Sequence, residues 1–141
     1  MKIGFEYLEE FISFGNRQFP ENIKDKGDCW DFELDSISIR PNIFTHKLCF
    51  SSYGTCRGQW GDHENIETAE IEGKPFDVNL TPKHFLKLEG YYDEMIEWAD
   101  ENDYEITDVE FIFKGKKKSK ELIVRFTVET ETTIDTWDYI L

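Results

Sequence analysis

Apolar and polar residues alternate in the first extended region of the chain. Over residues 30–35 the apolar side chains alternate with acidic ones, a period of two that predicts a strand with one buried face and one acidic face. The apolar phase then shifts by one position before Ile37 and Ile39. Such a shift, within a segment that remains extended, predicts a β-bulge near Asp35 and Ser36.

The same alternation predicts several further strands. It resumes over residues 44–50 after the turn residues at 40–42, so we expect a hairpin with the first strand. A second phase shift, near Thr107 and Asp108, predicts another bulge. The remaining strands are expected at residues 66–72, 76–80, 104–113, 122–128 and 134–141.

Two segments have the three- and four-residue spacing of amphipathic helices. The first begins at Phe5 and ends near Gly15 and Asn16. The second begins after Thr81, a good N-cap, with Pro82 in its first turn. Its apolar stripe, which we expect in the core, consists of Phe85, Leu88, Tyr92, Met95, Ile96 and Ala99.

Together these elements predict a single α+β domain over residues 1–141, with two helices, an antiparallel sheet of about seven strands and the order αββββαβββ. Runs of neighbouring strands without helices between them favour this class over a parallel doubly wound fold. Residues 51–62 are rich in Gly, Ser and Thr and carry Tyr53, Arg57 and Trp60. That composition is typical of a loop that presents aromatic and cationic groups.

Ten acidic residues and no Lys or Arg occur between Glu89 and Phe113. On the second predicted helix the carboxylates occupy the half opposite the apolar stripe, and Tyr91 and Trp98 lie along one border of that half. We interpret this acidic half as a partner-binding surface, or alternatively as the solvated helix face of an acidic protein. Its carboxylates belong to Glu89, Asp93, Glu94, Glu97, Asp100 and Glu101, and Asp103 follows them.

Local energetics disfavour such a helix. Carboxylates four residues apart repel one another by about 0.2–0.5 kcal/mol per pair, as in Asp93 with Glu97 and Glu97 with Glu101. Several of them also lie near the C-terminal end, where the helix dipole favours cations by about 0.3–1 kcal/mol each. Helix stability alone therefore does not explain this choice of residues.

The charge of the whole chain narrows the classes of partner. Thirty acidic and 16 basic residues give a net charge of −14, so the chain should repel nucleic acid and anionic membranes and attract basic protein surfaces. No apolar segment approaches membrane-spanning length, and the early Glu6 is atypical of a signal peptide. With three Cys and no CxxC motif, these features predict a cytoplasmic protein.

Residues that could carry chemistry are sparse. His46, Cys49, Cys56 and His63 form the one set that suggests a Cys2His2 zinc site, but their spacings fit no established pattern, so we expect no metal and no other cofactor. Asp62 beside His63 is the best catalytic fragment, and it lacks an identified nucleophile. The chain is therefore expected not to be an enzyme, with a hydrolase built around His63 as the alternative.

The lysine-rich residues 114–120 have two interpretations. They could contact phosphate or an acidic partner. We favour a solvated hairpin tip that blocks edge-to-edge strand pairing, because no aromatic residues are interleaved for base stacking.

From these patterns we expect a small inhibitor that binds a protein with a basic, nucleic-acid-binding surface, such as a nuclease or a CRISPR effector. The carboxylates of the second helix would stand in for phosphates, as in anti-CRISPR, other phage anti-defence and immunity-type proteins as classes. Trp98, Tyr91 or Trp60 would supply aromatic anchors. The alternative is a non-catalytic adaptor or structural subunit that contacts its partner through the aromatic loop at residues 51–62.

Overall fold

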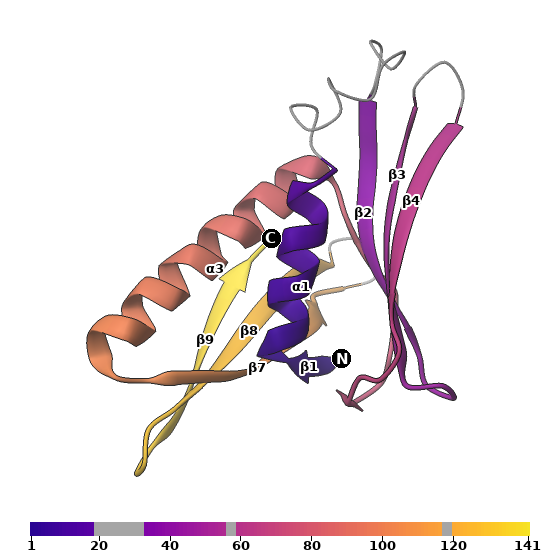
Figure 1. The fold of residues 1–141 in the computed structure, drawn as a ribbon. Coiled ribbons are helices and arrows are strands. Elements are labelled where there is room, and N and C mark those ends of the chain that lie inside the picture. The colour runs from indigo at the N-terminus through magenta and orange to yellow at the C-terminus, as the bar shows by residue number, and fades with distance from the viewer. Residues whose placement is uncertain (19–32, 56–58, 117–119) are drawn as a thin grey trace.

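The computed structural model of the chain describes residues 1–18, 33–55, 59–116 and 120–141, with the backbone alone described for residues 59 and 60 (Figure 1). The described residues form helices α1 (Phe5–Asn16) and α3 (Pro82–Asn102) and nine strands. The strands are β1 (Lys2–Gly4), β2 (Glu33–Asn42), β3 (Lys47–Thr55), β4 (Gln59–Ile66), β5 (Ile71–Glu72), β6 (Val78–Leu80), β7 (Glu105–Lys114), β8 (Glu121–Glu129) and β9 (Ile134–Ile140).

Two antiparallel sheets carry these strands, which confirms the predicted α+β class. A five-stranded sheet has the order β5-β1-β7-β8-β9, and a four-stranded sheet has the order β4-β3-β2-β6. The prediction of one sheet of about seven strands missed the division into two sheets and two of the nine described strands: β4, which lies partly in the predicted loop at residues 51–62, and β1, which has only three residues and lies between β5 and β7. A strand this short has too few residues to show a period of two, so its neighbours define it.

Both predicted β-bulges are present. The register of β2 against β3 shifts between Leu34 and Ser36, and that of β7 against β8 shifts between Ile106 and Asp108. In each case the extra residue moves the following apolar side chains back to the buried face of the sheet. The first half of the predicted strand at residues 30–32 lies outside the described residues.

Two turn and loop predictions were wrong. Residues 51–62 mostly continue β3 and β4, which pair from Leu48 with Ile66 to Thr55 with Gln59. Backbone pairing to a neighbouring strand outweighs the Gly- and Ser-rich composition here. The hairpin turn expected at residues 40–42 lies instead after Asn42, whose side-chain Oδ1 accepts the backbone N–H groups of Phe44 and Thr45 at 2.9 and 3.1 Å.

The core lies where the two helices meet both sheets. In Figure 1, α1 passes between α3 and the four-stranded sheet, and the five-stranded sheet lies behind the helices. The rings of Phe11 in α1, Phe50 in β3 and Phe85 in α3 meet in this core, with centroids 5.3 and 5.8 Å apart for Phe11 with each of the others. All three side chains are fully buried. One aromatic cluster therefore joins the helices to the four-stranded sheet.

The C-terminal end of α1 is fixed to the four-stranded sheet by polar contacts. The buried Gln18 accepts a hydrogen bond from Ser52 Oγ at 3.0 Å and donates one to Asp62 Oδ2 at 3.3 Å. Arg17 pairs with Glu64 at 2.7 Å. These bonds set the orientation of α1 relative to β3 and β4.

The second helix begins and packs as predicted. Thr81 Oγ1 accepts the backbone N–H of His84 at 3.2 Å, and Pro82 occupies the first turn. Within the predicted stripe, Phe85, Leu88, Met95 and Ala99 are buried, and Tyr92 and Ile96 are half-buried. The helix ends at Asn102, and the C-cap residue Asp103 adopts a left-handed conformation with φ of 57°.

Candidate acidic helix face

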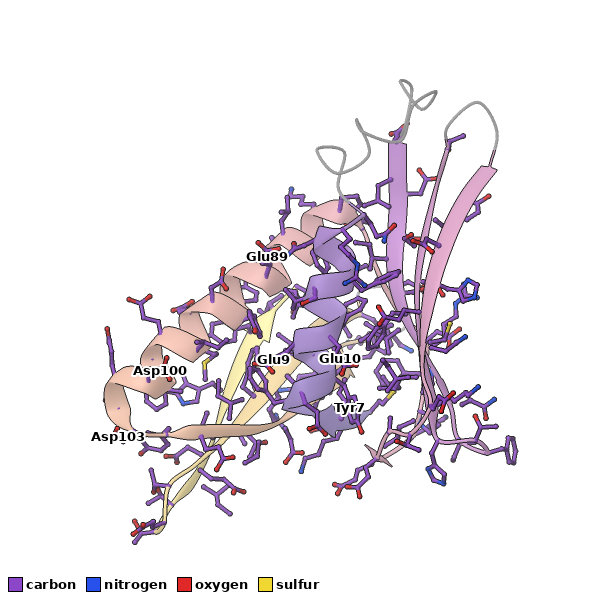
Figure 2. The ribbon with its side chains drawn as sticks, viewed as in Figure 1. Tyr7, Glu9, Glu10, Glu89, Asp100 and Asp103 are labelled. Carbon is purple, nitrogen blue, oxygen red and sulfur yellow. The ribbon has the colours of Figure 1, made fainter. Side chains whose placement is uncertain are left out.

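Two helices that are far apart in the sequence present their carboxylates side by side. The Phe5 ring of α1 stacks on the Tyr92 ring of α3 with centroids 5.6 Å apart, and Tyr92 Oη donates to Glu9 Oε1 at 3.4 Å. Figure 2 shows Glu9 on the side of α1 that faces the helix carrying Glu89 and Asp100, and Glu10 on the side toward the four-stranded sheet, where it lines a hollow with Arg17 and Glu64. We define the acidic helix face as seven carboxylates of these two helices, all exposed except the half-buried Glu89: Glu6, Glu9, Glu10, Glu89, Asp93, Glu97 and Asp100.

A groove separates the two helices at the end where the chain enters β7. It has a volume of about 290 Å³ and is lined by Phe5 and Glu9 of α1, Ile96 and Asp100 of α3, and Glu105 of β7, among others. A second hollow of about 360 Å³ adjoins it and shares Phe5, Glu9 and Glu105. The apolar floor and carboxylate rim of this groove suit a cationic side chain with an aliphatic stem.

The carboxylates of the acidic helix face have no cationic partner in the described part of the chain. The described ion pairs involve Lys2, Arg17, Lys114 and Arg125, whose partners lie on strands outside this face. Arg17 with Glu64 borders the face, at the C-terminal end of α1. The repulsion expected along α3 is therefore not relieved by these basic residues.

Glu89 is the most buried carboxylate of the acidic helix face. Burial raises the pKa of Glu89, the nearby Asp93 raises it further, and a hydrogen bond with the Asn16 side chain opposes the rise. Its Oε2 atom is buried and has no hydrogen-bond partner among the described residues. An ionised carboxylate at this position is therefore less well solvated than its neighbours.

Most of the predicted partner-binding carboxylates are exposed, but they face two sides of α3. Asp100 borders the groove beside α1, whereas Glu94 lies toward β9, where its charge raises the pKa of Tyr139 after the larger effect of burial. The exposed members of the predicted set are Asp93, Glu94, Glu97, Asp100, Glu101 and Asp103. The surface is thus wider than one helix stripe.

Two of the three predicted aromatic anchors pack within the protein itself. Tyr91 stacks on Tyr139 of β9 with centroids 4.4 Å apart, and its Oη donates to Ile140 O at 2.9 Å. Trp98 lies between Tyr104 and Trp137, with centroids 4.8 and 4.9 Å away. Half-buried between α3 and β9, these rings fix the helix to the sheet, and a role in partner binding stays a prediction.

The third predicted anchor, Trp60, is described only by its backbone. It lies in β4 opposite Gly54, in the four-stranded sheet and not on α3. Its side chain, together with the whole of Arg57, lies outside the described residues.

The predicted acidic surface did not include α1. Glu6, Glu9 and Glu10 recur at the three- and four-residue spacing of one helix side, opposite the buried Leu8 and Phe11. That spacing was visible in the sequence. The position of α1 beside α3 was not, because a tertiary contact decides it.

The catalytic and zinc candidates have other contacts. Asp62 accepts hydrogen bonds from Gln18 Nε2 and from the backbone N–H of His63, and neither involves the imidazole. Cys49 Sγ lies 3.5 Å from Ser51 Oγ, and Cys56 is outside the described residues. Within the described ranges, no group of three or more His, Cys, Asp or Glu side chains has an arrangement that could hold a metal ion.

Comparison with known proteins gives no match, either to a family model or to a curated sequence. No helix in the described residues is long and apolar enough to cross a membrane.

Proposed function

We propose that this protein is an inhibitor that occupies the basic, nucleic-acid-binding surface of a partner protein, such as a nuclease or an anti-phage effector of the CRISPR type. The observation that supports this proposal is the acidic helix face, where two helices contribute adjacent carboxylates that have no cationic partner in the described part of the chain. A basic partner surface would relieve their mutual repulsion, and charge complementarity would accelerate association.

The groove between the helices adds short-range specificity to this proposal. An arginine or lysine of the partner could place its aliphatic stem against Phe5 and Ile96 while its charge meets Glu9 and Asp100. In this respect the face differs from a uniformly charged surface. Binding should therefore depend on the position of the carboxylates and not only on net charge.

The test compares two variants of equal net charge. Glu10→Gln/Asp93→Asn/Glu97→Gln removes three carboxylates from the acidic helix face. Glu33→Gln/Asp77→Asn/Glu121→Gln removes three exposed carboxylates elsewhere. Both variants change the net charge from −14 to −11, because each removes three negative charges. The readout is displacement of a fluorescent DNA duplex from a panel of purified basic nucleases and DNA-binding effectors.

We expect the wild-type protein and the control variant to displace duplex from at least one panel member. The helix-face variant should do so about tenfold less well, since each lost charge contact contributes about 0.2–1 kcal/mol. Unfolding cannot explain that loss, because removing like-charged pairs on α3 should stabilise the helix by about 0.2–0.5 kcal/mol per pair. Equal weakening by both variants, failure to displace duplex from any member, or displacement that does not weaken between 50 and 300 mM salt would overturn the proposal.

A second candidate function is a non-catalytic adaptor. For such an adaptor, the β2–β3 hairpin is a better candidate contact surface than the loop predicted at residues 51–62. Phe44 at the hairpin turn is 92% exposed, and two hydrogen bonds to Asn42 Oδ1 order the turn around it. Arg40 and Lys47 flank the turn and are exposed. For an adaptor of this kind, Phe44→Ser should abolish partner capture, and the helix-face variant should leave it unchanged.

A further inference from the structure

Among the described residues, strand β9 forms one edge of the five-stranded sheet and pairs with β8 alone. Three large apolar side chains are exposed along its seven residues: Ile134 at 69%, Trp137 at 41% and Ile140 at 54%. The strand contains no Pro and no Lys, and its register against β8 is continuous without a bulge. The protection of this edge is therefore limited to the charges of Asp135 and Asp138 and to the hydrogen bond that Tyr91 Oη donates to Ile140 O.

The backbone pattern shows which groups face outward from this edge. The N–H of Leu141 donates to Leu122 O at 2.9 Å, so alternate residues back along the strand, including Trp137 and Tyr139, direct their backbone groups toward β8. The residues between them direct their N–H and C=O groups outward. The hydrogen bond from Tyr91 Oη to Ile140 O, on the side away from β8, agrees with this assignment.

We infer that β9 is a dimerisation strand, which pairs antiparallel with β9 of a second copy of this chain about a two-fold axis at Trp137. In this register Thr136 and Asp138 of one copy exchange backbone hydrogen bonds with Asp138 and Thr136 of the other, and Ile134 lies opposite Ile140. Trp137 meets its own copy at a non-hydrogen-bonded position, where side chains approach most closely. This inference is independent of the proposed function.

Neighbouring registers are less favourable, and this selects the axis at Trp137. An axis at Asp138 would place that carboxylate opposite its own copy. An axis at Thr136 would place Ile134 opposite Asp138. With the axis at Trp137, apolar residues lie opposite apolar residues and no carboxylate faces another. The charge of Asp138 is already compensated by Arg125 at 2.7 Å and Lys114 at 3.8 Å.

The two-fold axis would be perpendicular to the joined sheet, so both copies of α3 would lie on the same side of it. Two acidic helix faces would then be presented together. Because each copy carries a net charge of −14, the copies repel one another over long distances. Dimerisation should therefore strengthen as salt rises, whereas binding to a basic partner should weaken.

The experiment measures the mass of the full chain by sedimentation equilibrium, at increasing protein concentration and in low and high salt. We expect a shift from 16.8 kDa toward twice that mass, more complete in high salt. Ile134→Lys should weaken dimerisation about tenfold, because each of the two symmetry-related contacts is changed. Ile134→Lys/Ile140→Glu should restore it, since the two substituted positions lie opposite each other across the axis.

The matched control is Ile43→Lys, at an isoleucine with the same 54% exposure as Ile140 but at the β2–β3 turn. Circular dichroism verifies that each variant is folded. A chain that stays monomeric at about 500 μM in high salt overturns the inference, as does weakening by Ile43→Lys equal to that by Ile134→Lys. Failure of the double variant to restore the dimer, with its fold intact, overturns the register.

Discussion

The acidic helix face and the outer face of the five-stranded sheet differ in whether their carboxylates have cationic partners. On the sheet, Arg125 lies opposite Glu110 of β7 on one side and Asp138 of β9 on the other, so strand register places one cation between two acids. Lys2 likewise contacts Asp108 at 3.8 Å and Glu72 at 3.7 Å. The helices have no equivalent pairs among the described residues. Among the described residues, strand register therefore compensates these carboxylates of the sheet, whereas those of the acidic helix face have no such partner.

This difference bears on the origin of the acidity. If solubility alone determined the acidity, helix positions four residues apart would carry acidic and basic residues in alternation as readily as the strands of the sheet do. Instead α3 contains no Lys or Arg after Lys87. The comparison favours a binding role for the helix face and a structural role for the charges on the sheet.

The largest expected effect concerns the contact that holds the two helices together. A Cβ atom at Gly15 of α1 would lie 2.2 Å from the Phe85 ring of α3, so Gly15→Ala should lower the free energy of unfolding by about 1–3 kcal/mol. Urea denaturation followed by circular dichroism measures it. Gly90→Ala is the control, because no atom of the described residues lies within 4 Å of its Cβ, and it should stabilise α3 by up to about 1 kcal/mol. Equal effects of the two substitutions would contradict the close helix packing.

A smaller effect is expected on the sheet. Arg125→Gln leaves Glu110 and Asp138 without their shared cation and should lower the free energy of unfolding by about 1 kcal/mol or less, because the pair is partly exposed. The loss should shrink in high salt. Urea denaturation at two salt concentrations measures it, and an unchanged stability in low salt would show that the sheet network is not stabilising.

The smallest effect is on the pH dependence of the free energy of unfolding. The contribution of Glu89 on the helices and that of Asp138 on the sheet should change with pH in opposite directions. Burial raises the pKa of Glu89 in the folded state, so stability falls as pH rises from 4.5 through that raised value. The Arg125 hydrogen bond lowers the pKa of Asp138, so its contribution is present above 3.8 and is lost as pH falls through the lowered value.

Unfolding measurements between pH 3 and 8 test this difference. Glu89→Gln should gain stability relative to wild type at neutral pH and lose that gain below pH 4.5. Asp138→Asn should lose stability at neutral pH and approach wild type in acid. Shifts of the same sign in both variants would mean that the two carboxylates do not have the contrasting environments described above.

The elements with local signals could be predicted from the order of the residues. The Thr81 cap, the buried stripe of α3 and both β-bulges follow from the spacing of neighbouring residues, which the helix and strand periods fix directly. The antiparallel α+β class follows from the order of those elements.

Which distant segments lie together became known from the three-dimensional structure. Residues 59–66 form a strand because they pair with β3. Helix α1 lies beside α3, so Glu9 is part of the acidic helix face. Strand β9 lies under Tyr91 and Trp98, so two of the predicted anchors make internal contacts. The physical reason is that such contacts depend on complementary shape and backbone pairing between segments, and a periodic pattern along the chain carries no information about them.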